Sequence, residues 1–155
     1  MTPVDPIKPK SGEPTRDCIR FQDGFKYQLT EDAVYPTAVR PPEDICTRFV
    51  CMNTKGELLL KAGFAWNGVS GPTIQRNSNR RGGAFHDGYY RLIRFGLMNF
   101  MQREEARKLA DDMLREIWLA DGMWGWLVSA EIAMLRRFGD DAAKPSGEPT
   151  VMTSP

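Results

Sequence analysis

The sequence has few of the residues that bind structural metals. It holds one histidine, His86, and three cysteines, Cys18, Cys46 and Cys51, none of which are spaced as C-x-x-C. A zinc site built from histidine and cysteine is therefore not expected. Cys46 and Cys51 lie in an apolar run, and because free cysteine is usually buried, we interpret both as small core residues.

Long apolar runs and an excess of one charge are also missing. The longest apolar stretch, 123–130, stops at Glu131, well short of the roughly 20 residues that a membrane-spanning helix needs. The first residues have neither the basic start nor the apolar core of a secretory signal. With 21 Lys and Arg against 20 Asp and Glu, no overall field draws the protein to nucleic acid or acidic lipid. These features predict a protein made in a cytoplasm, with no transmembrane segment.

Proline is concentrated at the two ends of the chain. Residues 1–16 and 140–155 are rich in proline and poor in apolar side chains, which predicts extended arms around one domain over 17–139. The pentapeptide Ser-Gly-Glu-Pro-Thr occurs at 11–15 and again at 146–150. The repeat either reflects the shared composition of the arms or lets both arms dock on equivalent surfaces of a partner assembly.

The residues between the arms predict strands first and helices second. Residues 25–29 alternate with period two, and 46–52 and 57–62 flank Asn53-Thr54-Lys55-Gly56 as a hairpin. Apolar stripes with helical spacing follow, and they predict helices over 82–95, 102–120 and 123–138. The expected fold class is α+β, a small antiparallel sheet followed by a three-helix unit.

The second and third helices have predicted inner faces. That of the second helix comprises Ala106, Ala110, Met113, Leu114 and Ile117, and its expected surface ion pairs are Glu104 with Lys108 and Asp111 with Arg115. That of the third helix comprises Trp124, Leu127, Val128, Leu135 and Phe138.

Two residues of the third helix stand out from its pattern. Trp126 lies opposite the apolar face, where a monomer would not bury its side chain, so we interpret it as an intermolecular contact. Glu131 lies in the middle of the apolar face, where its carboxylate must find a partner or stay protonated. It is either a buried ion pair with an arginine of a neighbouring helix or a catalytic acid.

The candidate chemical site lies in a glycine-rich loop and in the polar start of the helix that follows it. Three glycines and a proline over 63–73 describe a tight loop that either cradles an ion or fixes Trp66 in the core. In the next helix His86 and Tyr90 share a face, and Asp87 is turned about 100° away. Asp111 borders the buried stripe of the second helix, from where it can reach His86. A carboxylate that orients an imidazole toward water is the arrangement of a general base. The alternative is a structural unit in which His86 and its acidic partner only hold the helices together.

Arginines cluster around the same loop. Residues 74–95 contain five arginines and one aspartate, a local charge of +4. Arg76, Arg80 and Arg81 are candidate anion-binding residues for lipid phosphate, a nucleic-acid backbone or an acidic partner. The alternative is a solvated segment whose partners lie in the acidic second helix.

Three motifs resemble a family of small phage and prophage proteins of unassigned function. They are Trp66-Asn67-Gly68-Val69-Ser70-Gly71-Pro72-Thr73, His86-Asp87-Gly88-Tyr89-Tyr90 and Ala110-Asp111, and the likeness covers roughly residues 20–139. The resemblance implies a phage or prophage origin. From the arms and Trp126 we expect a protein made in the host cytoplasm and associated with the virion, as a structural or accessory component of the tail or head-to-tail region. Its partners would be other phage structural proteins or its own copies, bound through the arms and Trp126.

The same residues are more distantly similar to the secreted phospholipase A2 enzymes. This resemblance implies that His86 is the general base, Tyr90 its support and Asp111 the orienting carboxylate. It also implies that Asp87, with Asn67 and Gly68 of the loop, binds calcium as the cofactor. The disulfides that flank the motif in those enzymes have no counterpart here. The alternative function is thus a calcium-dependent lipid-ester hydrolase that acts in host entry or lysis.

Overall fold

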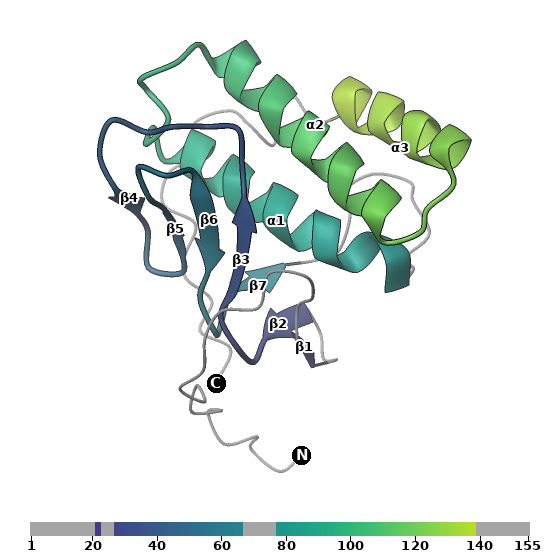
Figure 1. The fold of residues 1–155 in the computed structure, drawn as a ribbon, viewed down its shortest axis with the longest axis horizontal. Helices are drawn as coiled ribbons and strands as arrows, with labels where there is room; N and C mark the ends of the chain where they lie inside the picture. The colour runs from purple at the N-terminus through teal and green to yellow at the C-terminus, as the bar shows by residue number, and fades with distance from the viewer. Residues whose placement is uncertain (1–20, 23–26, 67–76, 139–155) are drawn as a thin grey trace.

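A computed structural model describes residues 21–22, 27–66 and 77–138, and these residues confirm the α+β fold (Figure 1). Short antiparallel strands come first and three helices follow. The strands are β1 Phe21–Gln22, β2 Tyr27–Leu29, β3 Ala33–Pro36, β4 Ile45–Cys46, β5 Val50–Met52, β6 Glu57–Leu60 and β7 Ala65–Trp66. The helices are α1 Asn77–Arg94, α2 Arg103–Ala120 and α3 Gly125–Phe138. The predicted arms lie outside the described residues.

The strands form two small sheets where the sequence predicted one. One sheet has the order β1-β2-β7 and the other β3-β6-β5-β4, with every pair antiparallel. Strand β3, which the sequence did not predict, pairs Ala33 with Leu60 and Pro36 with Glu57. Its proline is tolerated because β3 is an edge strand, where a missing backbone N–H breaks no ladder.

The predicted hairpin is confirmed between β5 and β6. Asn53 Oδ1 accepts hydrogen bonds from the backbone N–H groups of Lys55 and Glu57, at 3.1 and 3.0 Å, and so closes the turn. Gly56 has φ +83°, a conformation that glycine adopts without strain. The turn therefore follows from local side-chain chemistry, which is why the sequence shows it.

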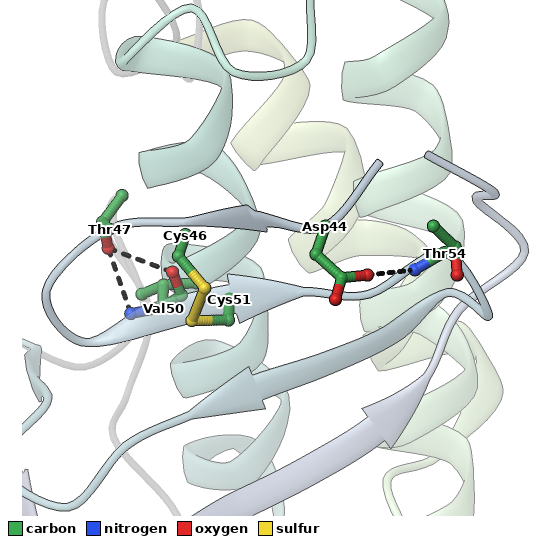
Figure 2. Close-up of a disulfide and its surroundings, with 6 residues drawn as sticks. All are labelled: Asp44, Cys46, Thr47, Val50, Cys51 and Thr54. Atoms are coloured by element: carbon green, nitrogen blue, oxygen red, sulfur yellow. Dashed lines mark hydrogen bonds between the residues drawn. A yellow bond between two sulfur atoms is a disulfide. The ribbon is translucent and has the colours of Figure 1, made fainter. Parts of the chain in front are cut away.

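The interpretation of Cys46 and Cys51 as buried free cysteines is wrong, because the two form a disulfide (Figure 2). The predicted strand over 46–52 is interrupted after Cys46, where the chain turns and comes back as β5. In this turn the Thr47 hydroxyl accepts a hydrogen bond from the Val50 N–H at 3.0 Å. The turn places Cys46 directly opposite Cys51, and Cys46 is exposed rather than buried.

Helix α1 lies between the four-stranded sheet and α2 (Figure 1). It begins at Asn77, five residues before the predicted start. The first turns carry no apolar stripe because glycine faces α2 there: a Cβ on Gly82 would lie 2.6 Å from Cδ1 of the buried Trp118. The Trp118 indole also donates a hydrogen bond to the Asn79 carbonyl at 3.1 Å. The end of the helix was predicted correctly, with Gly96 at φ +71° just beyond it.

Helix α3 packs on α2 around a second apolar cluster. All five residues predicted for the inner face of α2 are buried. On α3 the prediction for Trp124 is wrong, since its side chain is 68% exposed. The helix begins at Gly125, so Trp124 precedes it and does not follow its stripe, while Met123 and Ile132 are buried instead. Val128 and Leu135 are buried as predicted, and Phe138 lies where no side chain is described.

Candidate functional site

The candidate site is the contact between His86 of α1 and Asp111 of α2. The two helices lie side by side, and His86 Nε2 lies 2.8 Å from Asp111 Oδ1. Both residues are buried, His86 at 8% and Asp111 at 4% exposure. The contact predicted from the position of Asp111 beside the apolar stripe of α2 is therefore confirmed.

Tyr90 is the third member of this cluster. It lies one turn after His86, and its hydroxyl donates to the same Asp111 oxygen at 3.3 Å. The ring centroids of His86 and Tyr90 are 4.3 Å apart. Burial raises the pKa of Tyr90 to about 12, and the Asp111 carboxylate adds to this rise, while Arg107 acts against it. Tyr90 is therefore a neutral hydrogen-bond donor at physiological pH.

Arg136 of α3 binds the other oxygen of the same carboxylate. Its Nε donates to Asp111 Oδ2 at 3.3 Å, so one side chain joins all three helices. The predicted ion pair of Asp111 with Arg115 is therefore wrong, and the pair with Arg136 was not predicted, because an ion pair between helices leaves no spacing signal along one helix. Arg115 instead donates to Ser129 of α3 at 3.2 Å.

The other predicted surface pair of α2 is also replaced. Glu104 accepts a hydrogen bond from Arg107 at 3.2 Å, three residues on. Lys108 binds Asp112 at 3.1 Å, four residues on. An open pocket of about 350 Å³ is lined by Glu104, Arg107, Lys108, Asp111 and Arg136, and His86 does not line it. Because Arg107, Lys108 and Arg136 each have an acidic partner in or beside this pocket, we do not assign a ligand to it.

The charge around Asp111 fixes the protonation of the pair. Burial alone would raise the pKa of Asp111, but its hydrogen bonds and ion pairs with His86 and Arg136 outweigh burial and hold the pKa below its ordinary value. An ionised carboxylate only accepts hydrogen bonds, so the proton between the two groups belongs to His86 Nε2. In the neutral imidazole this tautomer leaves Nδ1 as the basic nitrogen.

Asp87 follows His86 on α1 and is half-buried. Burial raises the pKa of Asp87, and the charges of His86, Arg94 and Arg91 offset this only in part. The role of Asp87 as a calcium ligand stays a prediction.

The glycine-rich loop leaves β7 beside α1. The Arg91 guanidinium donates to the carbonyl of Ala65 at 3.3 Å and lies over the Phe64 ring, 4.7 Å from its centroid. The described part of the loop, which ends at Trp66, thus lies next to the helix that carries His86 and Asp87. Asn67 and Gly68, the other predicted calcium ligands, lie outside the described residues, as does Arg76. Within the described part of the chain, no three acidic, histidine or cysteine side chains gather to hold a metal.

Arg80 and Arg81 belong to α1 rather than to a loop before it. Arg81 binds Asp121 at the end of α2 through two nitrogens, at 3.0 and 2.7 Å, and both side chains are largely buried. This agrees with the alternative that the arginines find partners in the acidic second helix. Arg80 lies over the Tyr27 ring, 5.0 Å from its centroid.

Trp126 is exposed, as predicted, and Trp124 lies beside it. Each side chain is 68% exposed, and their ring centroids are 6.0 Å apart. Leu119 and Met134 are the other large apolar side chains that the described residues leave exposed. Glu131 is buried at 7% exposure, as expected of the inner face of α3. Its pairing with an arginine stays a prediction.

Comparisons with family models, with curated proteins and with solved structures found no match for this chain. None of the described helices is long and apolar enough to span a membrane.

Proposed function

We propose that this protein is a hydrolase of lipid esters in which His86 is the general base. The observation that carries the proposal is the hydrogen bond between His86 Nε2 and Asp111 Oδ1, with Tyr90 on the same oxygen. The geometry agrees with what the resemblance to phospholipase A2 enzymes implies for all three residues. The choice of lipid esters as substrate rests on that resemblance.

His86, Asp111 and Tyr90 have different roles in the proposed general base catalysis. His86 takes a proton from water at Nδ1, and the water oxygen forms a bond to the ester carbonyl carbon. The bond from that carbon to the alcohol oxygen then breaks, and His86 returns the proton to the departing alcohol. Asp111 keeps its negative charge throughout and stabilises the imidazolium, while Tyr90 and Arg136 hold the carboxylate in place.

Asp87 is the described residue that would hold calcium, together with Asn67 and Gly68 of the loop. When bound, the cation would stabilise the negative charge that develops on the ester oxygen. Support comes from the half-buried Asp87 carboxylate, whose pKa is raised by burial and which is adjacent in sequence to the proposed base.

Fatty acid release from phospholipid in mixed micelles tests this function. Wild-type protein should release fatty acid in millimolar calcium and stop when calcium is chelated. Asp87→Asn should lose the activity, and calcium should no longer raise its melting temperature. Asp112→Asn is the matched control, because Asp112 is ion-paired on the surface of α2 and should retain both responses. Wild-type protein that shows neither hydrolysis nor a calcium-dependent shift in melting would overturn the proposal.

A second candidate function is a structural or accessory component of a phage particle. The observation that favours it is the exposed pair Trp124 and Trp126, since large exposed aromatics mark interaction surfaces. Its test is whether purified particles contain the protein. Deleting 1–16 and 140–155 should then reduce incorporation and leave the melting temperature of the domain nearly unchanged, and normal incorporation would exclude the arms as assembly elements.

A further inference from the structure

The outer side of α3 and the end of α2 form an exposed apolar surface. We call the set Leu119, Trp124, Trp126 and Met134 the aromatic surface. Its side chains are 45%, 68%, 68% and 36% exposed. In Figure 1 this part of the molecule lies away from the two sheets, with α3 beside α2. Neither the fold nor the His86 site uses these side chains.

Helix α3 presents this surface without a negative charge. Its exposed residues before the last turn are Gly125, Trp126, Ser129, Ala130, Ala133 and Met134, which are apolar or small. The single acidic residue of the helix, Glu131, is buried on the opposite side. A surface helix of a soluble domain normally has charged residues facing solvent, so this outer side departs from the usual pattern.

Positive charge borders the same surface. Arg115 is exposed on α2 and bonds to Ser129 in the middle of α3, and Arg137 is exposed at the end of α3. Arg136 is also exposed there, but it binds the Asp111 carboxylate at 3.3 Å. The acidic groups nearby in sequence are engaged elsewhere. Asp121 is bound by Arg81 through two nitrogens, and Glu116 accepts a hydrogen bond from Tyr35 of the sheet at 3.3 Å.

We infer that the aromatic surface docks on an anionic lipid bilayer. Indole rings favour the boundary between lipid headgroups and acyl chains, and arginines beside them favour anionic headgroups. The glycine, serine and alanines exposed along α3 offer few directional polar groups to a specific protein partner. A bilayer needs only apolar side chains that can be inserted and positive charge at their border. Docking at this surface would bring the proposed lipid-ester hydrolase to its substrate, so the biological purpose of docking rests on the proposed function. Binding to vesicles can be tested without that function.

Sedimentation of the full chain with vesicles tests the inference. Vesicles of phosphatidylcholine with about 30% phosphatidylglycerol are the probe, because arginines beside the indoles favour anionic headgroups, and pure phosphatidylcholine vesicles are the comparison. Wild-type protein should bind the anionic vesicles and bind phosphatidylcholine at least about tenfold more weakly. Raising salt to 0.5 M should weaken the binding.

Two variants separate the indoles from the charges. Trp124→Ala with Trp126→Ala should reduce vesicle affinity about tenfold or more, while the conservative double change to Phe should retain part of it. Arg115→Gln with Arg137→Gln should reduce affinity about tenfold. The matched control is Arg48→Gln with Lys55→Gln, which removes two exposed cations from the sheet and should leave affinity unchanged.

The outcomes distinguish this inference from the proposed function. Vesicle binding that depends on Trp124 and Trp126 supports docking even if no ester is cleaved. Cleavage of micellar substrate without vesicle binding supports the hydrolase and overturns docking. Self-association through the two tryptophans, or equal binding by the tryptophan variant, would also overturn docking, and the former would favour a protein partner.

Discussion

At the scale of single residues, Asp111 is the centre of the polar interior. Its two oxygens bind side chains from α1 and α3, so the carboxylate both orients His86 and joins the three helices. Positioning and stability therefore depend on the same group. Positioning and stability can be separated by substituting residues near Asp111 that differ from each other in a single contact.

Tyr90 and Tyr89 are adjacent buried tyrosines with different hydrogen bonding. Tyr90 donates to Asp111, whereas the Tyr89 hydroxyl is buried without a partner in the described part of the chain. Tyr90→Phe should lower the free energy of unfolding by about 1 kcal/mol. Tyr89→Phe should leave it unchanged or raise it, because no hydrogen bond is lost. Urea denaturation measures both, and a larger cost for Tyr89→Phe would contradict the assignment of the network.

The pH dependence of stability should report the charge of Asp111. Its pKa is lowered in the folded state, so its contribution is present above the pKa of the unfolded chain, about 4, and is lost as pH falls through the lower folded value. Asp111→Asn should therefore lose about 3 kcal/mol at pH 7, and the cost should shrink as pH falls below 4. Equal costs at pH 7 and pH 2 in chemical denaturation would show that ionisation of Asp111 does not stabilise the fold.

Asp87 should behave in the opposite way. Its pKa is raised in the folded state, so its contribution is present at low pH and is lost as pH rises through the folded value. Without calcium, Asp87→Asn should melt higher than wild type at pH 7.5 and close to wild type at pH 3. A variant that melts lower than wild type at pH 7.5 would mean that the carboxylate stabilises the fold.

At the scale of elements, the parts predicted correctly are those whose cause is local. The stripe of α2, the turn at Asn53–Gly56 and the end of α1 near Gly96 each depend on residues within one segment. The first turns of α1 and the pairing of Cys46 with Cys51 depend on contacts with another segment, so the sequence pattern did not show them.

At the candidate site, too, predictions failed where the structure depends on contacts between segments. The contact of His86 with Asp111 was predicted because Asp111 borders the apolar stripe of α2, from where it can reach the preceding helix. Arg136 was missed because its position on α3 relative to α2 depends on how the two helices pack. Trp124 was placed on the wrong face because the prediction began the helix two residues too early.

The start of α1 should depend on the absence of a side chain at Gly82. A methyl group there would press on Trp118, so Gly82→Ala should destabilise the domain by about 1 to 3 kcal/mol despite the helix propensity of alanine. Gly125→Ala, at a helical position with open space, is the matched control and should be neutral or stabilising. Thermal melting measures both, and equal effects would contradict close packing of α1 on α2.

The disulfide should stabilise the β4–β5 hairpin through the short loop that it closes. Replacing Cys46 and Cys51 with serine should lower the free energy of unfolding by about 2 kcal/mol, as expected for a cross-link with a sequence separation of 5. Reductant should destabilise wild type by a similar amount and leave the double variant unaffected. If reductant has no effect on wild type, the two cysteines do not form the bond in solution.

At the scale of the whole molecule, the proposed base and the aromatic surface belong to one helical unit. Asp111 binds His86 on α1 and Arg136 on α3, and the outer side of α3 carries the exposed indoles. A lipid surface bound at α3 would thus meet the same three-helix unit that holds the base. The sheets, joined to α1 through Leu60 and the Arg91 contact with Ala65, support this unit from the other side.

The most direct test of the account is the rate of phospholipid ester hydrolysis by wild type and His86→Gln in saturating calcium, with the melting of both proteins measured in parallel. General base catalysis by His86 predicts that the variant loses about 10² to 10⁴ in rate while it still unfolds cooperatively. A folded His86→Gln variant that hydrolyses the ester as fast as wild type would contradict the central claim.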